Sequence, residues 1–207
     1  MWLKSDENFI RFDEKSNTYD SLEKLLVFLE HAKTDLDYWK WVIFALHDAL
    51  YGAMILSLQG TTSTRVIQIN KPLKEKLKKL YNINSLDVNN TQQVGKIWLH
   101  GKLISFSESF DRIQKKKFIK MNVNSKTFQA NNKHKESIKW LNDELRNPFA
   151  HFSPRGWSIA IDDIKNILNP CFEIIEFCLF KSGNVLLDEQ ENKTFKDIMI
   201  KLQNHIL

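Results

Sequence analysis

The sequence predicts an all-α fold, and three observations lead to this prediction. The chain of 207 residues contains 6 Gly and 4 Pro, so residues that interrupt regular structure are scarce. Apolar residues recur at three- and four-residue spacing over long stretches, which is typical of helices with one buried face. The composition, 43% hydrophobic and 27% charged, is that of a globular chain. The length fits a single domain over residues 1–207.

An N-terminal arm over residues 1–18 precedes the first predicted helix, at 19–33. Leucines at helical spacing give this helix an apolar face, and Asp20 followed by Glu23 fits its start. The N-terminal stretch contains neither an apolar core nor a small-residue cleavage site. We therefore expect no secretory signal there.

The second predicted helix, at 36–59, is apolar nearly all round and precedes Gly60, a residue suited to a helix C-terminus. Asp48 lies in its middle, and a carboxylate at the centre of a bilayer costs about 2.5–3.5 kcal/mol. We therefore expect the central helix of a bundle, no membrane partner and a cytoplasmic location. His47 and Asp48 need polar partners on this helix. They form either an internally satisfied pair or a support for a neighbouring functional site.

The middle of the chain is predicted to hold two helices and a basic segment. Pro72 opens a short basic helix at 72–81, because proline suits the first turn. A longer helix follows at 91–114, although Gly95 and Gly101 weaken it. The Lys- and Asn-rich segment 115–135 is predicted to be a basic loop or a mobile insertion.

A helix at 136–147 is predicted to end at Pro148, because proline disrupts a helix interior. The residues 153–156, Ser-Pro-Arg-Gly, read as a tight turn. This places the start of the next helix just after the turn.

The last core helix is predicted at 158–182, with Ser158 as its cap and a kink at Pro170. Cys171 and Cys178 both lie on it, and their spacing puts the Cα atoms about 10 Å apart, too far for a disulfide. We expect reduced, buried thiols, in keeping with a cytoplasmic location. The C-terminal appendage 185–207 adds a short helix.

The stretch from Arg146 to His151 reads Arg-Asn-Pro-Phe-Ala-His. The Arg closes a predicted helix, the polar Asn147 follows it, and the His falls in the break before the last long helix. This spacing arises often by chance, so its position in the fold carries the interpretation. The structural alternative is that Arg146 caps the carbonyls of its own helix and that His151 is a turn residue.

This arrangement resembles the R-x4-6-H motif of the HEPN superfamily, in which a polar residue usually follows the Arg. The resemblance implies a HEPN-like antiparallel helical bundle with a kinked last core helix and extra loops and short helices. Long predicted helices at 36–59, 91–114 and 158–182 agree with that layout. The likeness extends over much of the chain as architecture and over six residues as motif.

The resemblance also implies a function, a metal-independent endoribonuclease that acts through 2′-OH attack at a composite site of a homodimer. Arg146 would hold the phosphate, His151 would transfer the proton and Asn147 would support them. Histidine suits proton transfer near neutral pH, and the Arg fork binds two phosphate oxygens.

The same resemblance implies no cofactor and a toxin–antitoxin, anti-phage or stress role, with an antitoxin or nucleotidyltransferase as a further partner. The alternative function is a non-catalytic HEPN-like module that binds nucleotide, RNA or a protein partner. No His, Cys or acidic spacing in the sequence predicts a metal site.

The net charge of +5 allows a polyanionic partner such as RNA. Phe118 and Phe128 lie among lysines of the basic segment, and aromatic rings can stack on bases. The alternative is a solvated basic surface. The candidate RNA contacts are Arg155, Lys115, Lys116, Lys117 and Lys120. A second basic cluster comprises Lys71, Lys74, Lys76, Lys78 and Lys79.

Overall fold

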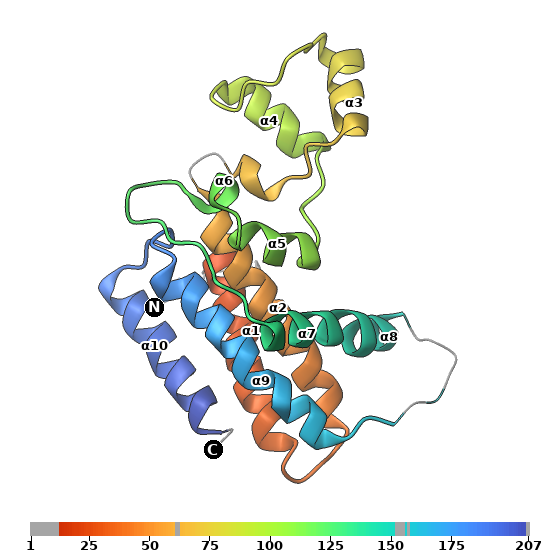
Figure 1. Ribbon diagram of the computed structural model, residues 1–207, viewed down its shortest axis with the longest axis vertical. Helices are drawn as coiled ribbons and strands as arrows, with labels where there is room; N and C mark the ends of the chain where they lie inside the picture. Colours follow the sequence, from red (N-terminus) through yellow and green to blue (C-terminus); the bar gives the residue numbers. More distant parts are fainter. Residues whose placement is uncertain (1–12, 61–62, 152–155, 157, 206–207) are drawn as a thin grey trace, which may run out of the picture.

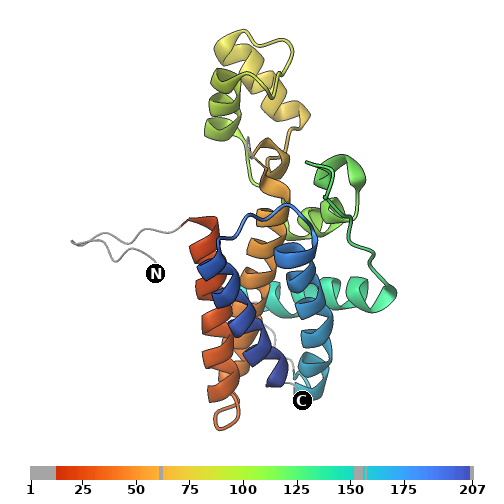
Figure 2. The same cartoon turned by 90° about the vertical axis from the view of Figure 1, so that its left-hand side faces the viewer.

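The structure is a computed structural model and describes residues 13–60, 63–151, 156 and 158–205. All regular elements in these ranges are helical, which confirms the predicted all-α class. Four helices lie side by side as the main bundle (Figures 1 and 2). They are α1 (Glu14–His31), α2 (Tyr38–Gln59), α9 (Ile161–Glu176) and α10 (Glu189–Asn204).

Helix α2 is the centre of the bundle and packs against α1 and α9. Leu46, Leu50 and Leu58 are fully buried along its length. It ends at Gly60, whose φ of 57° favours glycine, as predicted. By length and composition α2 is also apolar enough to cross a membrane, but 72% of that apolar window is buried inside the protein.

Helix α1 begins earlier than predicted. The Asp13 side chain accepts a hydrogen bond from the N–H of Ser16 at 2.7 Å, and the Ser16 hydroxyl accepts one from the N–H of Asp13 at 2.8 Å. This reciprocal cap satisfies two N–H groups at the helix start. The start predicted at Asp20 is therefore wrong, and residues 14–18 are helical.

The long helix predicted at 91–114 is wrong, because the structure has two helices there, α4 (Thr91–His100) and α5 (Phe106–Ile113). The chain turns at Gly101, where an added Cβ would overlap the Ile67 side chain. An isolated antiparallel bridge then joins Ile67 to Leu103. Ser105 caps α5 by accepting a hydrogen bond from the N–H of Glu108 at 3.2 Å.

Helices α3 (Lys71–Tyr81) and α4 form an arm, residues 71–100, that extends from one end of the bundle (Figures 1 and 2). Pro72 lies in the first turn of α3, as predicted, and Asn70 caps it by accepting from the N–H of Leu73 at 3.1 Å. A small apolar cluster separate from the main core holds the arm together. Its buried members are Ile67, Leu73, Leu77 and Ile97.

The basic segment 115–135 packs against the bundle, so it is not a loose insertion. It contains α6 (Lys116–Ile119), and the Asn184 side chain donates to the carbonyl of Ile119 at 2.7 Å. Phe128 is buried, and its ring lies 5.1 Å from that of Phe177. Phe128 is therefore a core residue and has no free face for a base.

Helix α9 begins at Ile161 with Ala160 in the cap position, so the predicted cap at Ser158 is wrong. The helix runs through Pro170 and continues as the π-helical segment η3 (Phe177–Lys181). Both cysteines are free and fully buried. Burial raises the pKa of Cys178 to about 12 and raises the pKa of Cys171 as well, so both stay protonated and unreactive.

Helix α10 packs against α1 and α9. Phe195 and Leu202 are fully buried in the main core. The ring of Phe195 meets that of Tyr19 edge-on at 5.5 Å. The C-terminal segment, predicted as an appendage, therefore contributes a helix to the bundle itself.

Candidate functional site

Three segments form one continuous motif helix: α7 (Asn132–Lys139), the π-helical η2 (Trp140–Arg146) and α8 (Asn147–Ala150). The prediction that Pro148 ends this helix is wrong, because the proline lies inside it. The N–H of Asn147 reaches back five residues to the carbonyl of Asn142. A π turn of this kind widens the helix, which makes room for the ring of a proline that has no N–H to donate. The ladder then resumes, with the N–H of His151 donating to Asn147 at 3.0 Å.

Arg146 is half-buried at the end of η2. Its Nη1 donates to the Asn147 side-chain oxygen at 3.2 Å. Its Nε is buried and has no hydrogen-bond partner in the described part of the chain. Such an unpaired buried donor costs about 1–3 kcal/mol. Within the described ranges Arg146 caps no carbonyl of its own helix, which argues against the structural alternative.

His151 is exposed at the C-terminal end of α8. Its imidazole makes no hydrogen bond or ion pair with any residue that the structure describes. Five residues of α-helix correspond to a rotation of about 140° and a rise of about 7.5 Å. Arg146 and His151 therefore project from different sides of the motif helix. The motif helix continues to Ala150, so the predicted helix break between Arg146 and His151 is absent.

His47 links α2 to the motif helix. It is buried and stacks on Phe106, with ring centroids 4.2 Å apart. Its Nδ1 lies 3.2 Å from the Asp48 carboxylate, and its Nε2 lies 3.3 Å from the Asn142 side-chain oxygen. The predicted partners of this polar pair thus include a residue of the motif helix.

Asn142 holds its oxygen toward His47 because its Nδ2 donates to the Asp143 carboxylate at 2.7 Å. Both ring nitrogens of His47 therefore face oxygen acceptors, so a neutral ring donates to one of them and a charged ring to both. Asn142 precedes Arg146 by four residues. A substitution of His47 therefore removes a contact to the motif helix about one turn before Arg146.

An apolar groove of about 710 Å³ lies beside α8, between the start of α2 and the region before α9. Trp41 is 48% exposed and Leu36 63% exposed at its edge. Phe149, two residues before His151, lines it as well. The motif therefore borders a surface with large exposed apolar side chains, which is typical of an interaction site.

The candidate lysines Lys115, Lys116, Lys117 and Lys120 are exposed. They lie on α6 or directly beside its two ends, near the α3–α4 arm, whereas α8 lies further down the side of the bundle (Figures 1 and 2). Lys115 pairs with Asp111 at 3.8 Å, and Lys117 lies over the Phe118 ring at 4.7 Å. The structure does not bring these lysines together with Arg146. Arg155 lies outside the described residues.

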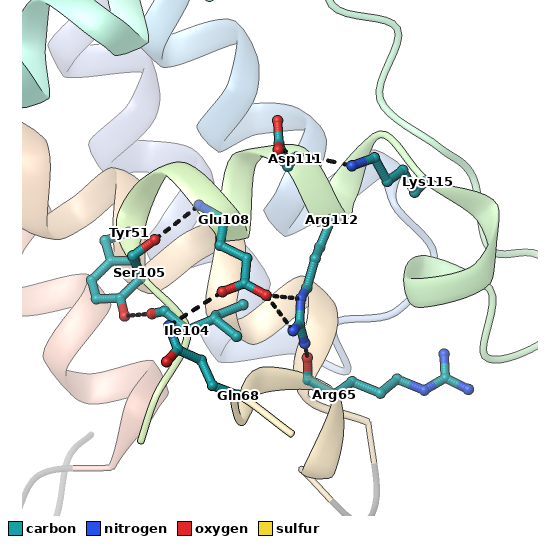
Figure 3. Close-up of polar contacts among 9 residues, drawn as sticks. All are labelled: Tyr51, Arg65, Gln68, Ile104, Ser105, Glu108, Asp111, Arg112 and Lys115. Carbon is teal, nitrogen blue, oxygen red and sulfur yellow. Dashed lines mark hydrogen bonds and ion pairs between the residues drawn. The ribbon is translucent and has the colours of Figure 1, made fainter. Parts of the chain in front are cut away.

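Sequence reasoning missed the buried network around Arg112 (Figure 3). This side chain donates through Nε and Nη2 to Glu108 and through Nη1 to the carbonyl of Arg65. It also lies over the Phe118 ring, 4.6 Å from the centroid. Glu108 and Arg112 are four residues apart on one helix, a spacing that favours ion pairs and could have indicated the network.

The Lys- and Asn-rich sequence around His134 favours an exposed side chain, and the structure contradicts this. It is buried, and its Nε2 faces the Glu173 carboxylate at 2.7 Å. Its Nδ1 accepts from the N–H of Asn131 at 3.2 Å, so Nε2 carries the proton and donates. In the described ranges no three His, Cys, Asp or Glu side chains are placed to hold a metal ion.

The fold and this geometry define an all-α helical bundle with an arginine–histidine motif on an irregular helix. No protein-family model, curated protein or solved structure matches the chain. The functional argument therefore proceeds from the residues of this chain.

Proposed function

We propose that this chain is a metal-independent endoribonuclease of the HEPN type. The observation that carries the proposal is that the buried Nε of Arg146 has no partner in the described residues. The Nη1 of the same guanidinium donates to the Asn147 side chain. A phosphate oxygen that displaces the groups covering Nε would supply the missing acceptor and a charge-assisted hydrogen bond. Arg146 thus binds the scissile phosphate in this proposal.

The chemistry requires a base, an acid and a cation. The base takes the proton of the RNA 2′-OH as that oxygen attacks the phosphorus, and the acid protonates the departing 5′-oxygen. The products are a 2′,3′-cyclic phosphate and a free 5′-OH. His151 performs a proton transfer, and Arg146 stabilises the charge that builds on the phosphorane.

The proposed active site is composite, formed by two copies of the chain. Arg146 and His151 project from different sides of the motif helix, so Arg146 of one copy meets His151 of a second copy. The apolar groove beside α8, with exposed Trp41 and Leu36, supports an interface at this place. Our proposal includes a cytoplasmic defence or stress role with an antitoxin or nucleotidyltransferase partner, which comes from the HEPN resemblance.

Cleavage of mixed RNA in EDTA tests the proposal. We expect wild type to produce fragments with 2′,3′-cyclic phosphate ends, and Arg146→Met and His151→Ala each to lower the rate by about 10²–10³-fold. His205→Ala, on the last described turn, is the matched control and should keep the wild-type rate. Wild-type activity in both motif variants would contradict the assignment.

Mixing the two inactive variants tests the composite site. A dimer of one Arg146→Met chain and one His151→Ala chain retains one intact pair of Arg146 and His151. After exchange of subunits in an equal mixture, roughly a quarter of the wild-type activity should return. A mixture as inactive as its components, although subunit exchange is shown, would place both residues of each site in one chain.

The second candidate function is a non-catalytic HEPN-like module that binds nucleotide, RNA or a protein partner. The observation in its favour is that the His151 imidazole has no orienting partner among the described residues, whereas catalytic bases are usually held by a third group. This function predicts no cleavage by any variant and RNA binding that weakens in Arg146→Met.

A further inference from the structure

The α3–α4 arm carries a dense positive charge. All five lysines of α3 are exposed, and the helix holds one acidic residue, Glu75, which lies 3.7 Å from Lys71. Lys71, Lys74 and Lys78 follow one another along one side of α3 at rises of about 4.5 Å and 6 Å. The helix therefore presents a row of cations to solvent, a surface that attracts a polyanion.

The opposite face of α3 packs against the rest of the arm. Leu73 and Leu77 are buried in the small cluster that joins α3 to α4. An amphipathic helix that binds a membrane needs a free apolar face to insert into the lipid. Leu80 is 52% exposed, but one exposed leucine among five lysines is not an apolar face, so α3 favours a partner that is recognised by its charge, such as a nucleic-acid backbone.

A groove of about 960 Å³ lies at the base of the arm. Lys15, Arg65 and Arg112 line it, and no Asp or Glu does so within the described residues. Lys15 pairs with Glu191 at 2.8 Å, and Arg112 pairs with Glu108. Arg65 forms no ion pair with a carboxylate in the described ranges, so its charge is uncompensated there.

Arg65 is also held in place. Its Nη1 donates to the carbonyls of Phe118 and Lys120, each at 2.9 Å. Figure 3 shows its side chain extending away from the Glu108–Arg112 pair. A half-buried guanidinium anchored through one nitrogen keeps its other donors for an anion.

The arm also carries an exposed aromatic ring. Trp98 on α4 is 40% exposed, on a helix that carries no acidic residue. Exposed rings on a basic surface such as this arm stack on unpaired bases, and duplexes keep their bases out of reach of such rings. This combination favours a single strand over a duplex.

We propose that the α3–α4 arm and the groove at its base bind single-stranded RNA. The lysines of α3 contact successive phosphates, Arg65 binds a phosphate in the groove, and Trp98 stacks on a base. The choice of RNA rests on the proposed function, whereas the binding of a single strand rests on the arm and groove themselves.

The salt dependence of binding tests this inference. Fluorescence anisotropy measures the binding of a labelled single-stranded RNA of about 16 nucleotides. Every variant is made in the full chain, and each also carries His151→Ala so that the RNA stays intact. Each lost phosphate contact lowers the slope of log affinity against log salt by about 0.7. We expect Lys74→Gln with Lys78→Gln to lower the slope by about 1.4. Adding Arg65→Gln should lower it by about 0.7 more, with thermal unfolding used to confirm the fold.

The matched control is Lys193→Gln with Lys201→Gln, which removes the same charge from exposed positions on α10. It should leave the slope unchanged. Equal slopes for the α3 variant and the control would overturn the inference. Tighter binding of the matching DNA, or lysine-dependent binding of anionic vesicles without RNA binding, would overturn it too. A further outcome is that wild type cuts no RNA while the α3 variant still shows a reduced slope of log affinity against log salt. That result would support RNA binding by the arm and contradict only the proposed nuclease function.

Discussion

Two arginines of this molecule, one buried and one half-buried, differ in how their donors are used. Arg112 is 9% exposed, and its Nε, Nη1 and Nη2 all donate to protein acceptors while Phe118 covers one face. Arg146 donates through Nη1 to its own neighbour Asn147, and its buried Nε donates to nothing in the described residues. The first arginine joins α5 to the segment that precedes the arm, and the second leaves hydrogen-bonding capacity unused.

The difference teaches how to tell a structural arginine from one that serves a ligand. Burying an unpaired donor costs stability, whereas a satisfied network does not carry that cost. An external anion that reached the Arg146 Nε would restore the lost hydrogen bond. Stability measurements can therefore separate the two arginines without any knowledge of the substrate.

The largest effect is expected from Arg112→Met. The substitution leaves the Glu108 carboxylate and the Arg65 carbonyl without their donor, so the free energy of unfolding should fall by about 2–3 kcal/mol. Urea denaturation measures the change. The double variant Arg112→Met with Glu108→Gln should recover part of the loss, because no unpaired charge remains. A loss below about 0.5 kcal/mol would show that the network is dispensable.

A smaller effect is expected from His47→Phe. The new ring keeps the stacking on Phe106 but loses the contacts to Asn142 and Asp48, so the free energy of unfolding should fall by about 1–2 kcal/mol. Asp48→Ala, at an exposed position, is the control and should cost less than about 0.5 kcal/mol. Equal losses in both variants would mean that the link to the motif helix contributes nothing.

Arg146→Met should change the free energy of unfolding by less than about 0.5 kcal/mol, or raise it. The substitution removes one hydrogen bond to Asn147 and also removes the buried, unpaired Nε, while the apolar stem is retained. Urea denaturation beside Arg112→Met gives the comparison directly. A loss of about 2 kcal/mol would make Arg146 a structural residue like Arg112.

The last prediction concerns stability at alkaline pH, in the region around Arg112. Burial raises the pKa of Tyr51 from 10.0 to about 12, and its hydroxyl donates to the carbonyl of Ile104 (Figure 3). Between these two pH values the folded state keeps a proton that the unfolded chain has lost, so stability falls as pH rises through this window. Tyr51→Phe should show a shallower fall in the free energy of unfolding across it. Parallel curves for both proteins would contradict the raised pKa.

Sequence reasoning worked where the signals were local. An unbroken apolar pattern and Gly60 placed the end of α2, and Pro72 placed the start of α3. It failed where a distant contact decided the outcome. Gly101 breaks the predicted helix at 91–114 because the chain must pass close to Ile67 there. His134 is buried beside Glu173 of α9, which accepts its hydrogen bond. The sequence around His134 does not indicate this distant partner.

For the candidate site, the residue types and their order along the chain came from the sequence, and their geometry did not. Helical periodicity, caps and charge along α3 follow from neighbouring residues, because their energies depend on groups within a turn or two. Only the tertiary structure decided that Pro148 lies inside a helix, just after a π turn. Helical geometry over this segment then puts Arg146 and His151 on different sides. The tertiary structure alone also shows that the Arg146 Nε is buried without a partner in the described residues. Hydrogen-bond satisfaction depends on groups that folding brings together from distant parts of the chain, and no local pattern records them.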